Sequence, residues 1–166
     1  SLPVSTFVPH ADGTFEQGAS AYEKRGVAVS VPEWLPENCI QCNRCSYVCP
    51  HATIRPFALS ADEAAKAPAQ TKYTAKMTGA PDYKFTIAVS PLDCMGCGVC
   101  VSVCPAKEKA LVMKPQESQS AQQEVFDFMV ANISKKPGMP ADETVKGSQF
   151  NQPLLEFSGS CAGCAE

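Results

Sequence analysis

The 166-residue sequence contains only two histidines and one tryptophan, and charged residues make up 19% of the chain. His10 and His51 are too few for a histidine-rich metal centre, and no C-x-x-C-H haem attachment motif occurs. The net charge of −3 includes no long block of either sign, so nothing points to a nucleic acid as a partner.

Long hydrophobic runs are also missing. The longest β-branched or apolar stretches, at 27–31, 85–89 and 110–113, fall far short of a membrane span. No charged and apolar leader of the export type precedes the first residues. We therefore expect a soluble, cytoplasmic protein without a membrane partner.

Cysteine, in contrast, is abundant and regularly spaced. Residues 39–50 (CIQCNRCSYVCP) and 94–105 (CMGCGVCVSVCP) both read C-x2-C-x2-C-x3-C-P, and together they hold eight of the ten cysteines. This run is the one by which bacterial two-cluster ferredoxins bind [4Fe–4S] clusters. Its duplication predicts an electron-transfer function.

The spacing also predicts which cysteines share a cluster. Two-residue gaps let one loop supply three corners of a cubane, while the fourth cysteine lies in the following helix and binds the other cluster. The first cluster would then take Cys39, Cys42, Cys45 and Cys104, and the second would take Cys94, Cys97, Cys100 and Cys49.

Zinc and disulfides are the structural alternatives for so many cysteines. Zinc ribbons pair two C-x-x-C knuckles and need four ligands per ion, a pattern that four cysteines per run do not follow. Disulfide frameworks belong mainly to short exported chains. Both alternatives are disfavoured by the two-residue gaps and the closing proline.

Strand, cluster loop with short helix, and strand follow one another twice. The expected elements are a strand at 27–31 that the following prolines break, a helix at 43–48 and a strand at 53–57, then a strand at 85–89, a helix at about 98–103 and a strand at 110–113. The predicted fold is α+β, a duplicated 2[4Fe–4S] ferredoxin-like domain with pseudo-twofold symmetry, extended flanking segments and one amphipathic helix.

Four regions follow from this reading. Residues 1–26 form an extended lead-in, and 27–115 form the ferredoxin-like domain, with an insertion at about 59–83. In the insertion, Ser60 and Glu63 predict a capping box and a helix ending at or before Pro68, followed by an irregular surface loop. A solvated loop is favoured there over a docking surface.

Residues 116–153 are predicted to form a connecting helix and a linker. A helical face within 120–133 presents Val125, Phe126, Met129, Val130 and Ile133, and should pack on the rest of the protein. Ser120 and Gln123 suggest a capping box, and residues 135–138 (KKPG) a stop.

Cys161 and Cys164 form a C-x-x-C pair near the end of the chain. Such a pair is a weak signal, compatible with a redox disulfide, half a zinc site or half a cluster site. If the pair belongs to a third cluster site, residues 154–166 contain only two of its four ligands.

Residues 13–29, 31–56, 93–111 and 152–164 together resemble pyruvate:ferredoxin (flavodoxin) oxidoreductase. The resemblance covers essentially the whole chain. It implies an internal segment of that large enzyme, holding the two-cluster ferredoxin domain and, from residue 154, the start of the thiamine diphosphate-binding domain.

The resemblance implies oxidative decarboxylation of pyruvate to acetyl-CoA and carbon dioxide, with thiamine diphosphate, Mg²⁺ and coenzyme A. Electrons would leave through three [4Fe–4S] clusters to ferredoxin or flavodoxin, and Cys161 and Cys164 match ligands of the cluster nearest thiamine. Such enzymes are commonly cytoplasmic homodimers of anaerobic metabolism. This segment contains no thiamine or coenzyme A motif, so alone it should not decarboxylate pyruvate. A free-standing two-cluster carrier and an enzyme for another 2-oxoacid remain alternatives.

Overall fold

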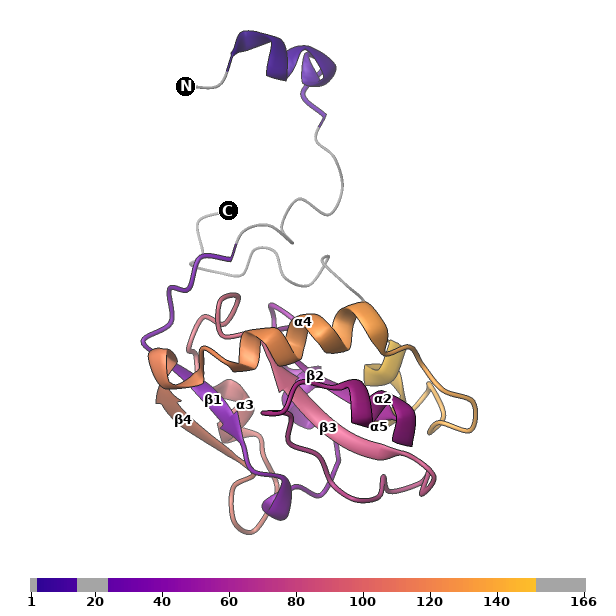
Figure 1. The fold of residues 1–166 in the computed structure, drawn as a ribbon. Helices are drawn as coiled ribbons and strands as arrows, with labels where there is room; N and C mark the ends of the chain where they lie inside the picture. The colour runs from indigo at the N-terminus through magenta and orange to yellow at the C-terminus, as the bar shows by residue number, and fades with distance from the viewer. Residues whose placement is uncertain (1–2, 15–23, 152–166) are drawn as a thin grey trace.

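The computed structural model describes residues 3–14 and 24–151, which form an α+β fold with short elements (Figure 1). The strands are β1 (Ser30–Trp34), β2 (Ile54–Leu59), β3 (Lys84–Val89) and β4 (Leu111–Pro115). The α-helices are α1 (Arg44–Tyr47), α2 (Ala61–Lys66), α3 (Val99–Ser102), α4 (Gln122–Asn132) and α5 (Val145–Ser148). Short 3-10 helices are η1 (Val4–His10), η3 (Pro36–Asn38), η4 (Gln116–Gln119) and η5 (Gln149–Asn151).

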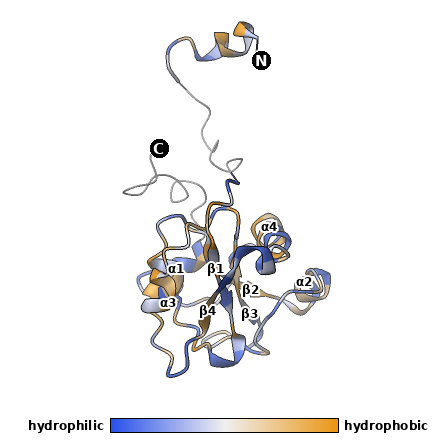
Figure 2. Ribbon diagram, turned by 90° about the vertical axis from the view of Figure 1, so that its left-hand side faces the viewer, coloured by the Kyte–Doolittle hydropathy of each residue, from blue (hydrophilic) through white to orange (hydrophobic). Residues whose placement is uncertain are grey.

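The strands pair across the two cysteine runs. Strand β1, which precedes the first run, lies antiparallel to β4, which follows the second, with Trp34 opposite Leu111. Strand β2 lies antiparallel to β3, with Ile54 opposite Val89. This exchange brings α1 and α3 into contact, and Figure 2 shows them side by side, away from α2 and α4.

The position of the first strand differs from the prediction at 27–31. Strand β1 runs from Ser30 to Trp34 and includes Pro32, which was expected to break the strand. A two-stranded sheet has only edge strands, where a proline can turn its missing N–H away from the partner. Val29, at 88% exposure, precedes the strand instead of packing in it. The other three strands and both short helices lie within about two residues of their predicted bounds.

The predicted capping box at Ser60 is confirmed. The Ser60 hydroxyl accepts the Glu63 backbone N–H at 3.3 Å, and Glu63 Oε2 accepts the Ser60 N–H at 2.8 Å. Helix α2 ends at Lys66, ahead of Pro68, as expected.

The rest of the insertion is irregular, but it is not all surface. Met77 is only 1% exposed and belongs to the main core, which corrects the prediction of a solvated loop. The Thr74 N–H donates to the Phe85 carbonyl at 2.8 Å, so this segment is attached to the edge of β3.

Helix α4 packs on one face of the β2–β3 sheet, as Figure 1 shows. The predicted apolar stripe is confirmed, because Val125, Phe126, Met129 and Ile133 are buried against Phe57, Leu59 and Ala88. The predicted Ser120–Gln123 capping box is wrong: Ala121 is the N-cap residue, and no side chain caps the helix. Gln123 Oε1 instead accepts from the Ser90 hydroxyl at 2.9 Å and the Leu92 N–H at 3.2 Å. The helix ends at Asn132, before the predicted stop.

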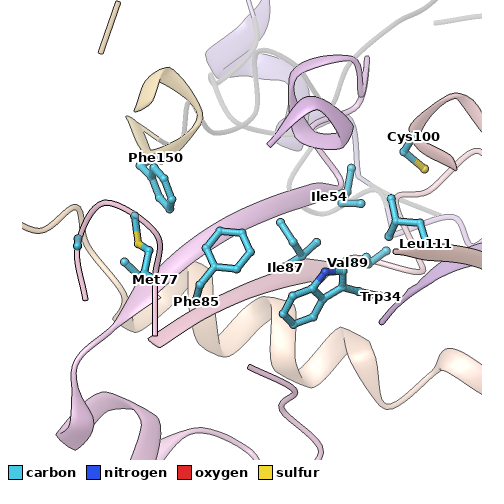
Figure 3. Packing of buried hydrophobic residues seen from close by; sticks show 11 residues of the cluster. Trp34, Ile54, Met77, Phe85, Ile87, Val89, Cys100, Leu111 and Phe150 are labelled. Carbon is cyan, nitrogen blue, oxygen red and sulfur yellow. The ribbon is translucent and has the colours of Figure 1, made fainter. Parts of the chain in front are cut away.

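The main core lies on the other face of the same sheet (Figure 3). Phe85 meets Trp34 and Phe150 edge to face, with ring centroids 6.0 and 6.3 Å apart. Cys100 is buried in this cluster, and Cys39, Cys45 and Cys49 pack against it. Each fully buried large apolar side chain contributes about 1.5–3 kcal/mol to the stability of the fold. The cysteine loops therefore pack on one side against a stable core.

No helix in residues 3–14 or 24–151 has the length and apolar character needed to cross a membrane.

Candidate metal centre

Cysteines from both runs surround one cavity. The cavity has a volume of about 340 Å³, including its open mouth, and Cys39, Cys42, Cys45 and Cys104 all line it. These are the four cysteines that the sequence predicts for the first cluster. The rest of the wall is mainly apolar, formed by Trp34, Ile40, Ile87, Pro105, Ala110 and Leu111, with Asn43 as its polar member.

The other four cysteines form a second group. The pKa of Cys100 is raised to about 12, mainly by burial and also by the nearby Cys49, Cys94 and Cys97. Burial likewise raises the pKa of Cys94, with Cys49 and Cys97 adding to the effect. Cys49 therefore lies with the three leading cysteines of the second run, although it belongs to the first.

The two groups adjoin. Burial raises the pKa of Cys45 strongly, and the neighbours that raise it further are Cys39 and Cys42 from its own group and Cys100 from the other. Cys45 and Cys100 lie in α1 and α3, the two helices that contact each other. Any groups held at the two sites would be neighbours as well.

Both cysteine loops have the same backbone geometry. Gln41 and Gly96, two residues after the first cysteine of each run, have φ angles of 58° and 71°. Their N–H groups donate to Cys39 Sγ and Cys94 Sγ, each at 3.4 Å. The left-handed conformation thus turns a backbone donor toward the first sulfur of each run.

Glycine is needed in the second loop for a steric reason too. A Cβ atom on Gly96 would lie 2.9 Å from the Ser30 carbonyl oxygen of β1, closer than real Cβ atoms approach. Gly98, with a φ of 72°, has nothing within 4 Å of the same position. Of these two glycines, Gly96 is the one whose missing side chain lets the second loop lie against β1.

The first loop stabilises its left-handed residues with side-chain hydrogen bonds. Gln41 Nε2 donates to Thr74 Oγ1 at 3.1 Å and to the Lys76 carbonyl at 3.0 Å. Gln41 Oε1 accepts the Thr78 N–H at 2.7 Å. A non-glycine residue at positive φ costs of order 1–3 kcal/mol, and these bonds to the insertion offset that cost.

The segment around α5 also holds the first loop. Asn43, at a φ of 59°, donates from Nδ2 to the Lys146 carbonyl at 2.9 Å. The Ser46 hydroxyl donates to Gln149 Oε1 at 2.8 Å. Both the insertion and the segment after α4 therefore contribute to the geometry of the first cysteine loop.

Sequence reasoning missed Gln41 and Asn43. Aligning the two runs would have revealed them, because Gln41 stands opposite Gly96 and Asn43 opposite Gly98. A glycine in one copy marks a position where the other copy also needs a positive φ.

The donor set fits iron–sulfur clusters. Metals bind thiolates, and burial raises the pKa of Cys39, Cys45, Cys94 and Cys100, so deprotonating them together requires a compensating cationic group. Within residues 3–14 and 24–151, no three His, Cys, Asp or Glu side chains lie close enough to hold a single metal ion. A cubane takes one thiolate at each of four corners, which spaces its ligands more widely than one ion does.

A buried donor supports the same fit. Trp34 Nε1 is buried, lines the cavity beside Cys39, and has no hydrogen-bond partner among the residues that the structure describes. Burial raises the pKa of Cys39, and the indole N–H of Trp34 partly opposes that rise. An indole N–H can only donate, and the sulfurs of a cluster accept hydrogen bonds.

Cys161 and Cys164 lie outside the described residues. Their assignment to a third cluster therefore stays a prediction.

Comparison with known families finds similarity for two parts of the chain. Residues 38–108 match a family described as a 4Fe-4S dicluster domain, and residues 1–28 match one described as a domain of unknown function. All eight cysteines of the two runs lie within the residues that match this 4Fe-4S dicluster domain.

Larger proteins match the chain over its whole length. It is 53% identical over 167 residues to the pyruvate-flavodoxin oxidoreductase of Enterobacter agglomerans, covering 100% of this chain and 14% of the relative. It is 54% identical to the pyruvate:ferredoxin oxidoreductase of Moorella thermoacetica, with 99% of this chain and 14% of the relative aligned. For the mitochondrial pyruvate dehydrogenase [NADP(+)] of Euglena gracilis the identity is 46%, over 99% of this chain and 9% of the relative.

The chain spans about 14% of the length of the two bacterial oxidoreductases. Over its whole length it is homologous to a segment of these enzymes, which confirms the resemblance noted in the sequence.

Proposed function

We propose that this chain is the electron-transfer segment of a pyruvate:ferredoxin (flavodoxin) oxidoreductase. It passes electrons from the thiamine-bound intermediate of pyruvate oxidation through [4Fe–4S] clusters to ferredoxin or flavodoxin. The observation that carries this proposal is the grouping of Cys104 with Cys39, Cys42 and Cys45 around one cavity. The dicluster family and the names of the relatives support it.

The two ligand sets are Cys39, Cys42, Cys45 and Cys104 for the first centre, and Cys94, Cys97, Cys100 and Cys49 for the second. A bound [4Fe–4S] cluster supplies one-electron oxidation and reduction. The chain's own residues fix the geometry: Gln41 and Gly96 direct N–H groups at the first sulfur of each run. The apolar wall of the first cavity limits the access of water, one of the factors that set a reduction potential.

The domain is proposed to be a pseudo-twofold duplication spanning 27–115. The exchange of strands between the two runs and the matching N–H to sulfur contacts support this symmetry. Residues 1–26 lead into the domain, and 116–153 connect it to the segment 154–166, in which the thiamine diphosphate-binding domain would begin.

The remaining chemistry belongs to the larger protein. Cys161 and Cys164 would provide half of a third cluster site, and other parts of the polypeptide would supply thiamine diphosphate, Mg²⁺, coenzyme A and the remaining ligands. We propose a cytoplasmic homodimer working in anaerobic metabolism. The small share of each relative that this chain covers supports a larger whole.

Anaerobic purification, followed by iron and acid-labile sulfide analysis and EPR after strong reduction, tests the proposal. The two sites of the dicluster domain should contribute about eight iron and eight sulfide per chain, with coupled S = 1/2 signals. Zinc without sulfide would refute the electron-transfer assignment. Reduction by pyruvate and coenzyme A in the full polypeptide, but not by other 2-oxoacids, would identify the substrate.

A further inference from the structure

Arg55 is a buried arginine next to the second cysteine group. It lies on β2 opposite Ala88 and is only 5% exposed. Its Nε donates to the Ala52 carbonyl at 2.5 Å, whereas Nη1 is buried and has no hydrogen-bond partner in the described part of the chain. Arginine is almost never buried unless it is paired, so this side chain requires an explanation.

The nearest charges do not neutralise the guanidinium. Its central carbon lies 5.8 Å from the ring centroid of Phe126 on α4, and Lys24 Nζ lies at the same distance from that ring. Asp93 Oδ2 accepts from Lys24 Nζ and from the Ser90 hydroxyl, both at 2.6 Å. Arg55 takes part in none of the ion pairs found between described residues. Lys24 Nζ also lies 3.9 Å from Oδ1 of the exposed Asp127, so both nearby carboxylates pair with Lys24 and neither pairs with the guanidinium.

A short chain of contacts connects Arg55 to Cys49. The Ala52 N–H donates to the Cys49 carbonyl at 3.3 Å, and the Ala52 carbonyl accepts from Arg55. Thr53, next to Ala52, places its hydroxyl 3.4 Å from Cys49 Sγ. Burial lowers the pKa of Arg55, and Cys49 and Asp93 are the two groups that oppose this lowering. Cys49 is thus the cysteine that these contacts link to Arg55.

The first cysteine group has no equivalent buried cation among the described residues. Its buried orphan donor is the neutral indole N–H of Trp34. Its nearby cations include Lys146, which is only partly buried and donates to the Thr78 carbonyl at 2.7 Å, and the exposed Lys109, which donates to the Cys104 carbonyl at 2.7 Å. Water screens a partly exposed charge far more than a buried one.

We propose that Arg55 raises the reduction potential of the second centre above that of the first and thereby gives electron flow a direction. This inference rests on the proposed function. Transfer of one electron between the centres oxidises the first and reduces the second, which gains one negative charge. A buried positive charge stabilises that reduced form, and charge near a cluster is one of the factors that set its potential.

Potentiometric EPR titration of the full polypeptide containing this chain tests the inference. Arg55→Gln removes the buried charge, Arg55→Lys keeps it, and Arg44→Gln removes an equal charge from an exposed position of α1 beside the first loop. The signal of the second centre is identified by its change in Cys97→Ser. Iron and sulfide are counted in every variant.

For Arg55→Gln, the ratio of reduced to oxidised second centre at a fixed potential should fall about tenfold, which is about 59 mV for a one-electron couple. Arg55→Lys should restore most of this loss. Arg55→Gln should change the ratio of reduced to oxidised first centre by no more than about twofold, and Arg44→Gln should change the second-centre ratio by no more than about twofold. A second-centre ratio that changes no more in Arg55→Gln than in Arg44→Gln would overturn the inference.

Two further outcomes are decisive. If Arg55→Gln loses iron, Asp93→Asn is used, because it removes the opposing charge. A higher reduced fraction at the second centre then supports the inference, and an unchanged fraction overturns it. Absence of iron and sulfide in the wild-type protein would refute the proposed function itself, and the inference with it.

Discussion

A methyl group added at Gly96 should disturb the second cysteine loop far more than one added at Gly98. Both glycines have positive φ, 71° and 72°, so replacement by alanine costs each about 1–2 kcal/mol in backbone strain. A Cβ at Gly96 would in addition lie 2.9 Å from the Ser30 carbonyl and 3.3 Å from the Ala28 Cβ, whereas a Cβ at Gly98 has nothing within 4 Å. Overpacking of this kind costs about 1–3 kcal/mol.

Gly96→Ala should therefore lower the free energy of unfolding by about 2–5 kcal/mol, and Gly98→Ala by about 1–2 kcal/mol. Anaerobic denaturant unfolding, followed by cluster absorbance and circular dichroism, measures both values. Because the Gly96 N–H donates to Cys94 Sγ, Gly96→Ala should also weaken iron retention at the second centre. Equal destabilisation by the two substitutions would refute the steric role of Gly96 against β1.

Three other predictions concern the parts that support the site. Gln41→Ala removes three hydrogen bonds to the insertion while keeping a strained φ, so it should destabilise the first loop by about 1–3 kcal/mol. EPR during mild chelation should then show iron leaving the first centre before the second. Equal loss from both centres would contradict this prediction. Met129→Ala, at a residue with 0% exposure, should cost about 2–5 kcal/mol in denaturant unfolding without changing cluster potentials, and a potential shift would show that α4 does more than pack. Burial alone would raise the pKa of Glu63, but Lys136 and the Ser60 N–H outweigh it and lower that pKa. The ionised Glu63 carboxylate therefore stabilises the fold fully at neutral pH. This stabilisation is lost only as pH falls through the folded-state pKa, below the ordinary value of 4.5. The difference in unfolding free energy between wild type and Glu63→Gln should accordingly stay constant from about pH 8 to about pH 5.5, and a change within that range would contradict the assignment.

The sequence predicts the features that depend on local spacing. Cysteine gaps, strand propensity and helical periodicity anticipated the crossed grouping around the first cavity, three of the four strands and the buried face of α4. Ser60 and Glu63 are neighbours on the chain, so their capping box also follows from local sequence. Each of these features needs little information about distant residues.

The features that were missed depend on distant partners. Ser120 looks like a cap, but Gln123 turns to Ser90 and Leu92, about thirty positions earlier in the chain. Met77 looks like part of a polar loop, but the edge of β3 and the core cover it. The register of β1 depends on β4, and the conformation of Gln41 depends on the insertion. Tertiary contacts decide all four.

The central claim is that each centre takes ligands from both runs, and exchange of single cysteines tests it most directly. EPR of the reduced protein should be recorded for Cys49→Ala, Cys97→Ala and Cys42→Ala, with iron and sulfide counted in each. The account predicts that Cys49→Ala alters the signal that Cys97→Ala alters and leaves the signal that depends on Cys42. If Cys49→Ala instead alters the same signal as Cys42→Ala, each run binds its own cluster, and the crossed arrangement is wrong.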